Sequence, residues 1–200
     1  MIDDLDITDE EKQYFKHLLA TDPQANLEQR YAFFQDYNPD YAQNRFGFLP
    51  QLIERDWMVI AFNDQDFSYT AGLYYRYNQP EIMLASSQRD MLERMHILNT
   101  IGTFVRDGTV LEEGKNYAAV MFDDSLFQIS TLTFRRYTQA DFEVMPCGLL
   151  FSFYQFFKDE LFEDGNDIPM LIAEIDEPAK LPSVEKRLDS MIKGWFKGRK

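Results

Sequence analysis

Side chains able to act on a small ligand are concentrated in one short stretch, FSYTAGLYYRYNQPEIMLAS. The hydroxyl groups of Tyr69 and Thr70 and the carboxyl group of Glu81 are types that transfer protons or bind polar ligands. The guanidinium group of Arg76 could hold an anion. Gly72 lies among them, and a strand glycine allows a bulge or a close approach of another group. A ligand cleft beside Gly72 is therefore one interpretation, but strand packing and turn chemistry explain the same residues, and we prefer that reading.

Two pairs of aspartates offer the only carboxylate combinations that suggest a metal ion. Asp64 and Asp66 form one pair, and Asp123 and Asp124 form the other. Both pairs lie in predicted turns, where aspartate is common because its side chain bonds to nearby backbone groups. The chain lacks the His-Glu-x-x-His and Cys-x-x-Cys spacings of metal sites, so we expect neither a metal nor another cofactor.

Motifs for nucleophilic catalysis and for phosphate binding are absent from the sequence. The nine glycines are scattered singly, so neither the P-loop nor the dinucleotide-binding pattern occurs. Cys147 follows Met145 and Pro146 without a basic neighbour, and we expect a buried, unreactive thiol. His96 lies within an apolar helical pattern, which favours a structural role over acid–base catalysis. The sequence contains no assembled catalytic set.

The chain carries a formal net charge of −14. Such a surface repels phosphate backbones, which argues against nucleic-acid binding, and it attracts basic proteins. Residues 183–200 are basic, so the acidity belongs to the rest of the chain. We expect a basic protein partner, and we take the four aspartates named above as candidate contact residues. Homo-oligomer formation is left open by the sequence.

The cellular location is predicted from three features of the sequence. Residues 1–11 are acidic where a secretory signal would be basic and apolar. Apolar runs are shorter than the ~18 residues that span a bilayer, so we do not expect a membrane protein. A single cysteine suits a reducing compartment. Together these features predict a cytoplasmic protein.

The order of hydrophobic patterns predicts an α+β fold with a mainly antiparallel sheet and flanking helices. We expect three parts: an N-terminal helical extension (1–50), an α+β core domain (51–182) and a C-terminal amphipathic helix (183–200). The last helix would either dock on the body of the protein or meet a partner. The predicted strands are 57–62, 67–75, 81–86, 116–122, 125–134 and 168–175. A helix is predicted for 89–105, a helical hairpin for 1–37 and irregular structure for 38–55. The pattern of 148–162 fits a buried helix or a strand, and its length favours the helix.

Several short pieces in this order resemble a bacterial family known only as a domain of unknown function. The resemblance covers about residues 52–135 and consists of a Tyr-Thr-x-Gly-Leu strand, a Pro-Glu turn into an apolar strand, a helix, and a glycine-bearing turn. These pieces are Tyr69, Thr70, Gly72, Leu73, Gln79, Pro80, Glu81, Asp107, Gly108 and Gly114. Gln79 stands where the family usually has histidine, which weakens any acid–base role at that position. The resemblance implies a fold and no activity.

Two functions therefore remain in view. The preferred one is a non-catalytic binding protein whose acidic, aromatic-rich surface engages a basic protein, for example an immunity protein that neutralises a bacterial toxin. The alternative is a small-molecule-binding domain or an enzyme that uses the cleft beside Gly72. In that alternative Tyr69 or Glu81 would transfer protons, and Arg76 would hold an anion.

Overall fold

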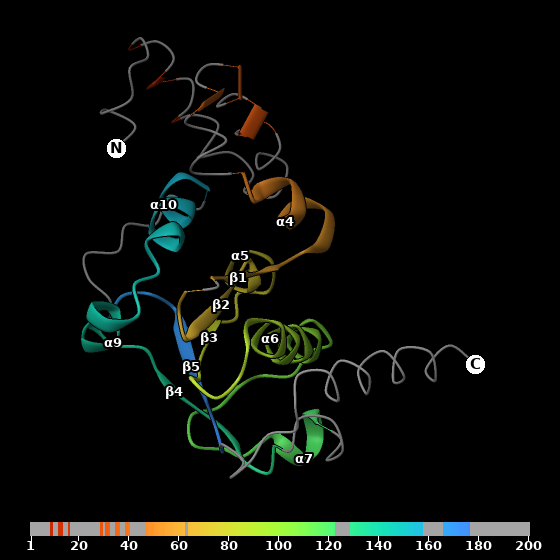
Figure 1. The fold of residues 1–200 in the computed structure, drawn as a ribbon. Helices are drawn as coiled ribbons and strands as arrows, with labels where there is room; N and C mark the ends of the chain where they lie inside the picture. The colour runs from red at the N-terminus through yellow and green to blue at the C-terminus, as the bar shows by residue number, and fades with distance from the viewer. Residues whose placement is uncertain are drawn as a thin grey trace. The chain divides into compact units, whose positions relative to one another are not determined.

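The computed structural model describes residues 47–62, 64–122, 129–157 and 166–176, together with scattered positions between 9 and 40 (Figure 1). The predicted helical hairpin of 1–37 and the predicted helix of 183–200 lie wholly or largely outside the described residues. The predicted boundaries at 50 and 182 therefore stay predictions.

A five-stranded sheet with the order β1-β2-β3-β5-β4 forms the centre of the described structure. Two of its pairings are antiparallel: Ser68 lies opposite Leu84 in β2 and β3, and Phe134 lies opposite Ala173 in β4 and β5. The α+β class predicted from the sequence is thus confirmed. The strands are β1 (Met58–Ala61), β2 (Phe67–Ala71), β3 (Glu81–Ala85), β4 (Leu132–Arg136) and β5 (Met170–Ile175).

Helices fill most of the segments between the strands. The longest, α6, begins after Asp90, whose carboxylate accepts a hydrogen bond from the Glu93 amide at 2.9 Å, and it ends before Gly108 in a left-handed conformation. Its buried side chains include Ile97, Leu98 and Ile101, as the helical spacing predicts. The helices are α4 (Leu49–Arg55), α5 (Leu73–Tyr77), α6 (Met91–Arg106), α7 (Ala118–Met121), α9 (Gln139–Val144) and α10 (Gly148–Phe157).

The chain divides into two compact units that interleave in sequence. One comprises residues 1–58, 70–81 and 137–170, and the other comprises 59–69, 82–136 and 171–200. In the first unit, Phe153 of α10 contacts the rings of Phe48 and Tyr75, with centroids 5.9 and 5.8 Å apart. In the second unit, α6 lies alongside the sheet and contacts α7 (Figure 1).

The outer edge of β4 is covered by the segment before α7. The amide of Gly114 donates to the Phe134 carbonyl at 2.9 Å, and the amide of Tyr117 donates to the Leu132 carbonyl at 2.8 Å. Tyr117 also packs edge-on against Phe134, with centroids 5.6 Å apart. These bonds satisfy part of an edge that would otherwise be open to another strand.

Three local predictions were wrong. The strand predicted for 67–75 ends at Ala71, because Gly72 adopts φ 116° and begins helix α5. Within the strand predicted for 116–122, Ala118–Met121 form helix α7, and just before it the Asn116 side-chain oxygen accepts a hydrogen bond from the Ala118 amide at 3.0 Å. The stretch 38–55, predicted to be irregular, contains helix α4, which starts with a proline in its first turn.

Candidate functional site

The buried carboxyl group of Glu81 is the centre of the polar residues that the sequence singled out. It accepts hydrogen bonds from the Thr70 hydroxyl at Oε2 (2.6 Å) and from the amides of Gly72 (2.7 Å) and Tyr74 (3.1 Å) at Oε1. The Tyr154 hydroxyl donates a further bond to Oε1. We call these five residues, Glu81, Thr70, Gly72, Tyr74 and Tyr154, the Glu81 clasp. It joins the ends of β2 and β3 to α5 and α10.

Gly72 makes this arrangement possible. Its left-handed φ of 116° turns the chain from β2 into α5, so that the first amides of the helix face the carboxyl group. A Cβ at this position would meet the Leu52 side chain and would lie 2.8 Å from the Asp56 carbonyl oxygen and 3.1 Å from the Trp57 Cα. The close approach predicted for Gly72 is therefore made by the protein's own α4–β1 connection.

The carboxyl group at the centre of the clasp is isolated from solvent. Glu81 has no exposed surface and Tyr154 is fully buried. Burial raises the pKa of Glu81 above its usual value, while the hydrogen bonds from Thr70, Tyr154, Tyr74 and Gly72 oppose that shift. Burial and the neighbouring carboxyl group raise the pKa of Tyr154 well above its usual value.

The other two candidates of the opening stretch lie elsewhere. Tyr69 is buried in β2 opposite Met83, and its ring stacks on Phe67 with centroids 6.5 Å apart. Arg76 lies on α5 with its guanidinium carbon 5.7 Å from the centre of the Tyr75 ring. The structure thus joins Thr70, Gly72 and Glu81 by hydrogen bonds but gives Tyr69 and Arg76 different surroundings.

The first aspartate pair lies in the connection between β1 and β2, and both Asp64 and Asp66 are exposed. Asp123 and Asp124 lie outside the described residues. Three backbone carbonyl groups of the β1–β2 connection accept hydrogen bonds. Those of Phe62 and Gln65 accept from Arg94 Nη2 at 3.5 and 2.6 Å, and that of Asp66 accepts from the Ser86 amide at 2.7 Å. Arg94 therefore bonds to the backbone at Phe62 and Gln65, on either side of the exposed Asp64.

Arg94 was not singled out by the sequence reading, although it organises the second unit. It is 3% exposed, and beyond the β1–β2 connection it also bonds to the Ser68 hydroxyl (3.2 Å) and to the carbonyls of Ser86 (3.3 Å) and Arg89 (2.7 Å). Burial lowers its pKa, and the carboxylates of Asp66 and Asp90 counter that effect. An arginine on the apolar face of a predicted helix was the signal that could have identified it.

Tyr154 was also missed. It lies in the apolar run GLLFSFYQFF of α10, where its hydroxyl group is one of few polar atoms. A buried tyrosine hydroxyl needs a hydrogen-bond partner, which the sequence could have suggested. The identity of that partner, 73 residues away, could not be read from the pattern.

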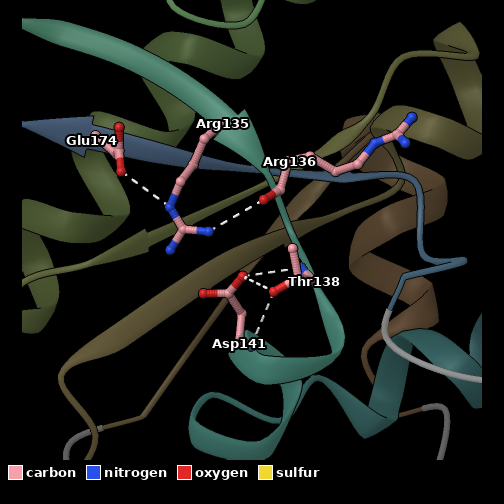
Figure 2. Close-up of polar contacts among 5 residues, drawn as sticks. All are labelled: Arg135, Arg136, Thr138, Asp141 and Glu174. Atoms are coloured by element: carbon pink, nitrogen blue, oxygen red, sulfur yellow. Dashed lines mark hydrogen bonds and ion pairs between the residues drawn. The ribbon is translucent and has the colours of Figure 1, made fainter.

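The adjacent arginines of β4 point apart, as expected for a strand (Figure 2). Arg135 pairs with Glu174 of β5, with Nε and Oε1 3.0 Å apart, and donates to the Arg136 carbonyl at 3.2 Å. Figure 2 also shows Thr138 and Asp141, which form a capping box at the start of α9.

Cys147 is buried, as predicted, and its thiol donates to the Tyr137 hydroxyl at 3.6 Å. Burial raises its pKa to about 11, so the thiolate is scarce at neutral pH. Within the described ranges, no group of three His, Cys, Asp or Glu side chains is placed to hold a metal ion. The described helices are all too short or too polar to cross a membrane.

Comparison with known proteins gives a family and no activity. A family described as "Domain of unknown function (DUF4262)" matches residues 51–156, which contain the whole Glu81 clasp. Neither a curated protein nor a solved structure matches the chain. The match spans more than half of the chain and agrees with the resemblance noted in its sequence. The chain therefore belongs to the DUF4262 family.

Proposed function

We propose that this protein is a non-catalytic binding protein that engages a basic protein partner through its acidic surface. The observation that carries the proposal is the net charge of −14, which favours encounter with a positively charged surface and opposes contact with nucleic acid. Among the described residues, half-buried aromatic side chains such as Tyr77 of α5 can supply the anchors that binding energy requires.

The β1–β2 connection is the part of the described surface that best fits such an encounter. It exposes Asp64 and Asp66, while Arg94 holds the carbonyl groups of Phe62 and Gln65. Backbone that is already hydrogen-bonded before binding loses less conformational freedom in the complex. The partner would therefore meet exposed carboxylates whose neighbouring backbone is bonded to Arg94.

The Glu81 clasp supports a structural interpretation of Thr70, Gly72 and Glu81. Both carboxyl oxygens of Glu81 accept bonds from donors of the same protein, and the group has no exposed surface. A general acid or base must reach the proton that it transfers. The alternative function, a ligand held beside Gly72, gains no support from the close approach of Leu52 and Asp56 to that glycine.

A basic toxin is one partner class that suits this surface, and the protein would then act as an immunity protein in a bacterium. The proposal places it in the cytoplasm, where the buried Cys147 thiol stays reduced. Such a protein acts by covering the toxin's basic active surface, so its own chemistry is not required.

The test uses a charge reversal on the loop and a matched reversal elsewhere. A partner recovered from the native host on the immobilised protein would be purified and its affinity measured by calorimetry. Asp64→Lys is expected to weaken binding at least about tenfold, because a cation replaces an anion within the contact. Glu113→Lys changes the net charge equally on another exposed turn and is expected to weaken binding much less.

Equal losses in the two variants would mean that only the overall charge matters and that the loop is not the contact. Binding that is unchanged by either reversal, or a recovered partner that is acidic, would overturn the proposed function.

A further inference from the structure

Two exposed valines lie on either side of Tyr117, at the start of helix α7. Val110 is 59% exposed and Val120 is 65% exposed. The Tyr117 hydroxyl donates to the Val110 carbonyl at 3.0 Å, and the Tyr117 carbonyl accepts from the Val120 amide at 3.0 Å. We call these two valine side chains the α7 face. Valine gains free energy when its side chain leaves water, so a segment that covers this face would be stabilised there.

The chain leaves the described structure close to α7 (Figure 1). Asp176 is the last described residue, and its carboxylate accepts hydrogen bonds from the amides of Ser130 and Thr131 at 2.9 and 2.6 Å. The side chain of Asn116, which precedes α7, donates to the carbonyl of the same Ser130 at 3.4 Å. Asp176 and the start of α7 are therefore joined through a single residue of the segment before β4.

Residues 177–182 limit how far the following segment can reach. The steps from Asp176 to Ser183 extend over about 25 Å at most, and Pro178 and Pro182 restrict the backbone further. The α7 face lies in the same compact unit as β5, beside the point where the described chain ends. Residues 183–200 therefore begin within reach of α7.

The sequence of residues 183–200 suits an apolar surface with carboxylates nearby. Its six lysine and arginine side chains outnumber the carboxylates of Glu185 and Asp189. Its apolar side chains recur at helical spacing, so a helix would gather them into one stripe. An isolated helix of this length is marginal in water, and the stripe gains most when it packs on other apolar groups. The stripe consists of Val184, Leu188, Met191, Ile192, Trp195 and Phe196.

The connection between α6 and α7 carries the matching charge. Asp107, Glu112 and Glu113 are all exposed there. Arg106 pairs with Asp107 at 2.9 Å and Lys115 pairs with Glu112 at 2.7 Å, whereas Glu113 has no ion pair among the described residues. Exposed ion pairs of this kind are weak, so their carboxylates stay open to other cations. Charge complementarity thus favours a basic segment at the α7 face.

We propose that residues 183–200 dock on α7 of the same chain. The apolar stripe covers Val110 and Val120, and the basic side chains lie beside the carboxylates of the α6–α7 connection. Of the two roles predicted for this segment, docking on the body of the protein is thereby assigned to a particular face. The proposal is independent of the basic partner, because Asp64 and Asp66 take no part in it.

Amide hydrogen exchange of residues 183–200 in the full-length protein tests the docking. We expect exchange at least about tenfold slower than in an unstructured chain of the same sequence. Val120→Lys removes apolar surface and sets a cation against a basic segment, so it is expected to abolish most of this protection. Val144→Lys is the control, because Val144 is 76% exposed on α9 in the other unit and its replacement should leave the protection unchanged.

Wild-type protein without protection in residues 183–200, or equal protection in the two lysine variants, would refute the docking.

Chemical cross-linking identifies the occupant of the α7 face. Val120→Cys would be combined with Met191→Cys and treated with a short bis-maleimide, and Val144→Cys with Met191→Cys is the control pair. The buried Cys147, with its pKa raised to about 11, does not compete for the reagent. We expect a link within one chain that forms at least about tenfold faster in the first pair. A link between two chains would mean that a second copy covers α7, and equal rates in the two pairs would mean that the segment lies elsewhere; both results contradict the proposal.

Discussion

Replacing Arg94 with methionine is expected to lower the free energy of unfolding by about 4 kcal/mol. The substitution removes the donors that bond to the Ser68 hydroxyl and to four backbone carbonyls, and it leaves Asp66 and Asp90 without the charge that faces them. Buried carbonyl groups without donors are costly because they have given up their bonds to water. Urea denaturation at neutral pH measures the loss.

Arg106→Met is the matched control for this prediction. Arg106 lies on the same helix and pairs with Asp107, but its side chain is 46% exposed, so its loss should cost below about 1 kcal/mol. Arg94→Lys keeps the charge without the planar arrangement of donors, and we expect an intermediate loss. If Arg94→Met and Arg106→Met cost the same, then Arg94 does not organise the second unit.

Gly72→Ala is expected to cost about 3 kcal/mol, because the new methyl group meets backbone that cannot move away without distorting α4 and β1. The left-handed φ of 116° adds strain for any side chain, and the Asp56 carbonyl oxygen lies 2.8 Å from the position of the Cβ. Thermal unfolding followed by circular dichroism measures the effect.

Gly108→Ala separates the two causes. Gly108 also has a left-handed φ, of 97°, but nothing lies within 4 Å of its Cβ position. Its replacement should cost about 1 kcal/mol, from backbone strain alone. Similar losses at the two glycines would show that the close approach to Gly72 contributes nothing.

The sequence predicted the elements whose pattern is strong and local. The 3.6-residue period of α6 and its Asp107-Gly108 end were visible, and so were the apolar runs of β1, β3 and β5. The α4 and α7 helices were missed because each is short, and because Tyr117 and Val120 favour a strand by propensity alone. A proline in the first turn favours α4, and a bond from the Ala118 amide to the Asn116 side chain precedes α7.

The candidate site was predictable only in part. Thr70, Gly72 and Glu81 attracted attention by type and spacing, and the structure joins them by hydrogen bonds. Their contact with Tyr154, like the contact of Arg94 with Ser68, depends on which elements pack together. A single sequence does not show which elements pack together. The strand predicted for 67–75 was too long for a related reason. A glycine that caps a helix and a glycine that forms a strand bulge cannot be distinguished by sequence alone.

The central claim is that the acidic surface of this protein attracts a basic protein partner and that no reaction is catalysed. The most direct measurement is the association rate constant of the wild-type protein with its purified partner, recorded by stopped flow as the salt concentration rises. The account predicts a fall of about tenfold or more between about 0.02 and 0.2 M salt, because ions screen the attraction of exposed charges. An association rate that is indifferent to salt would contradict it.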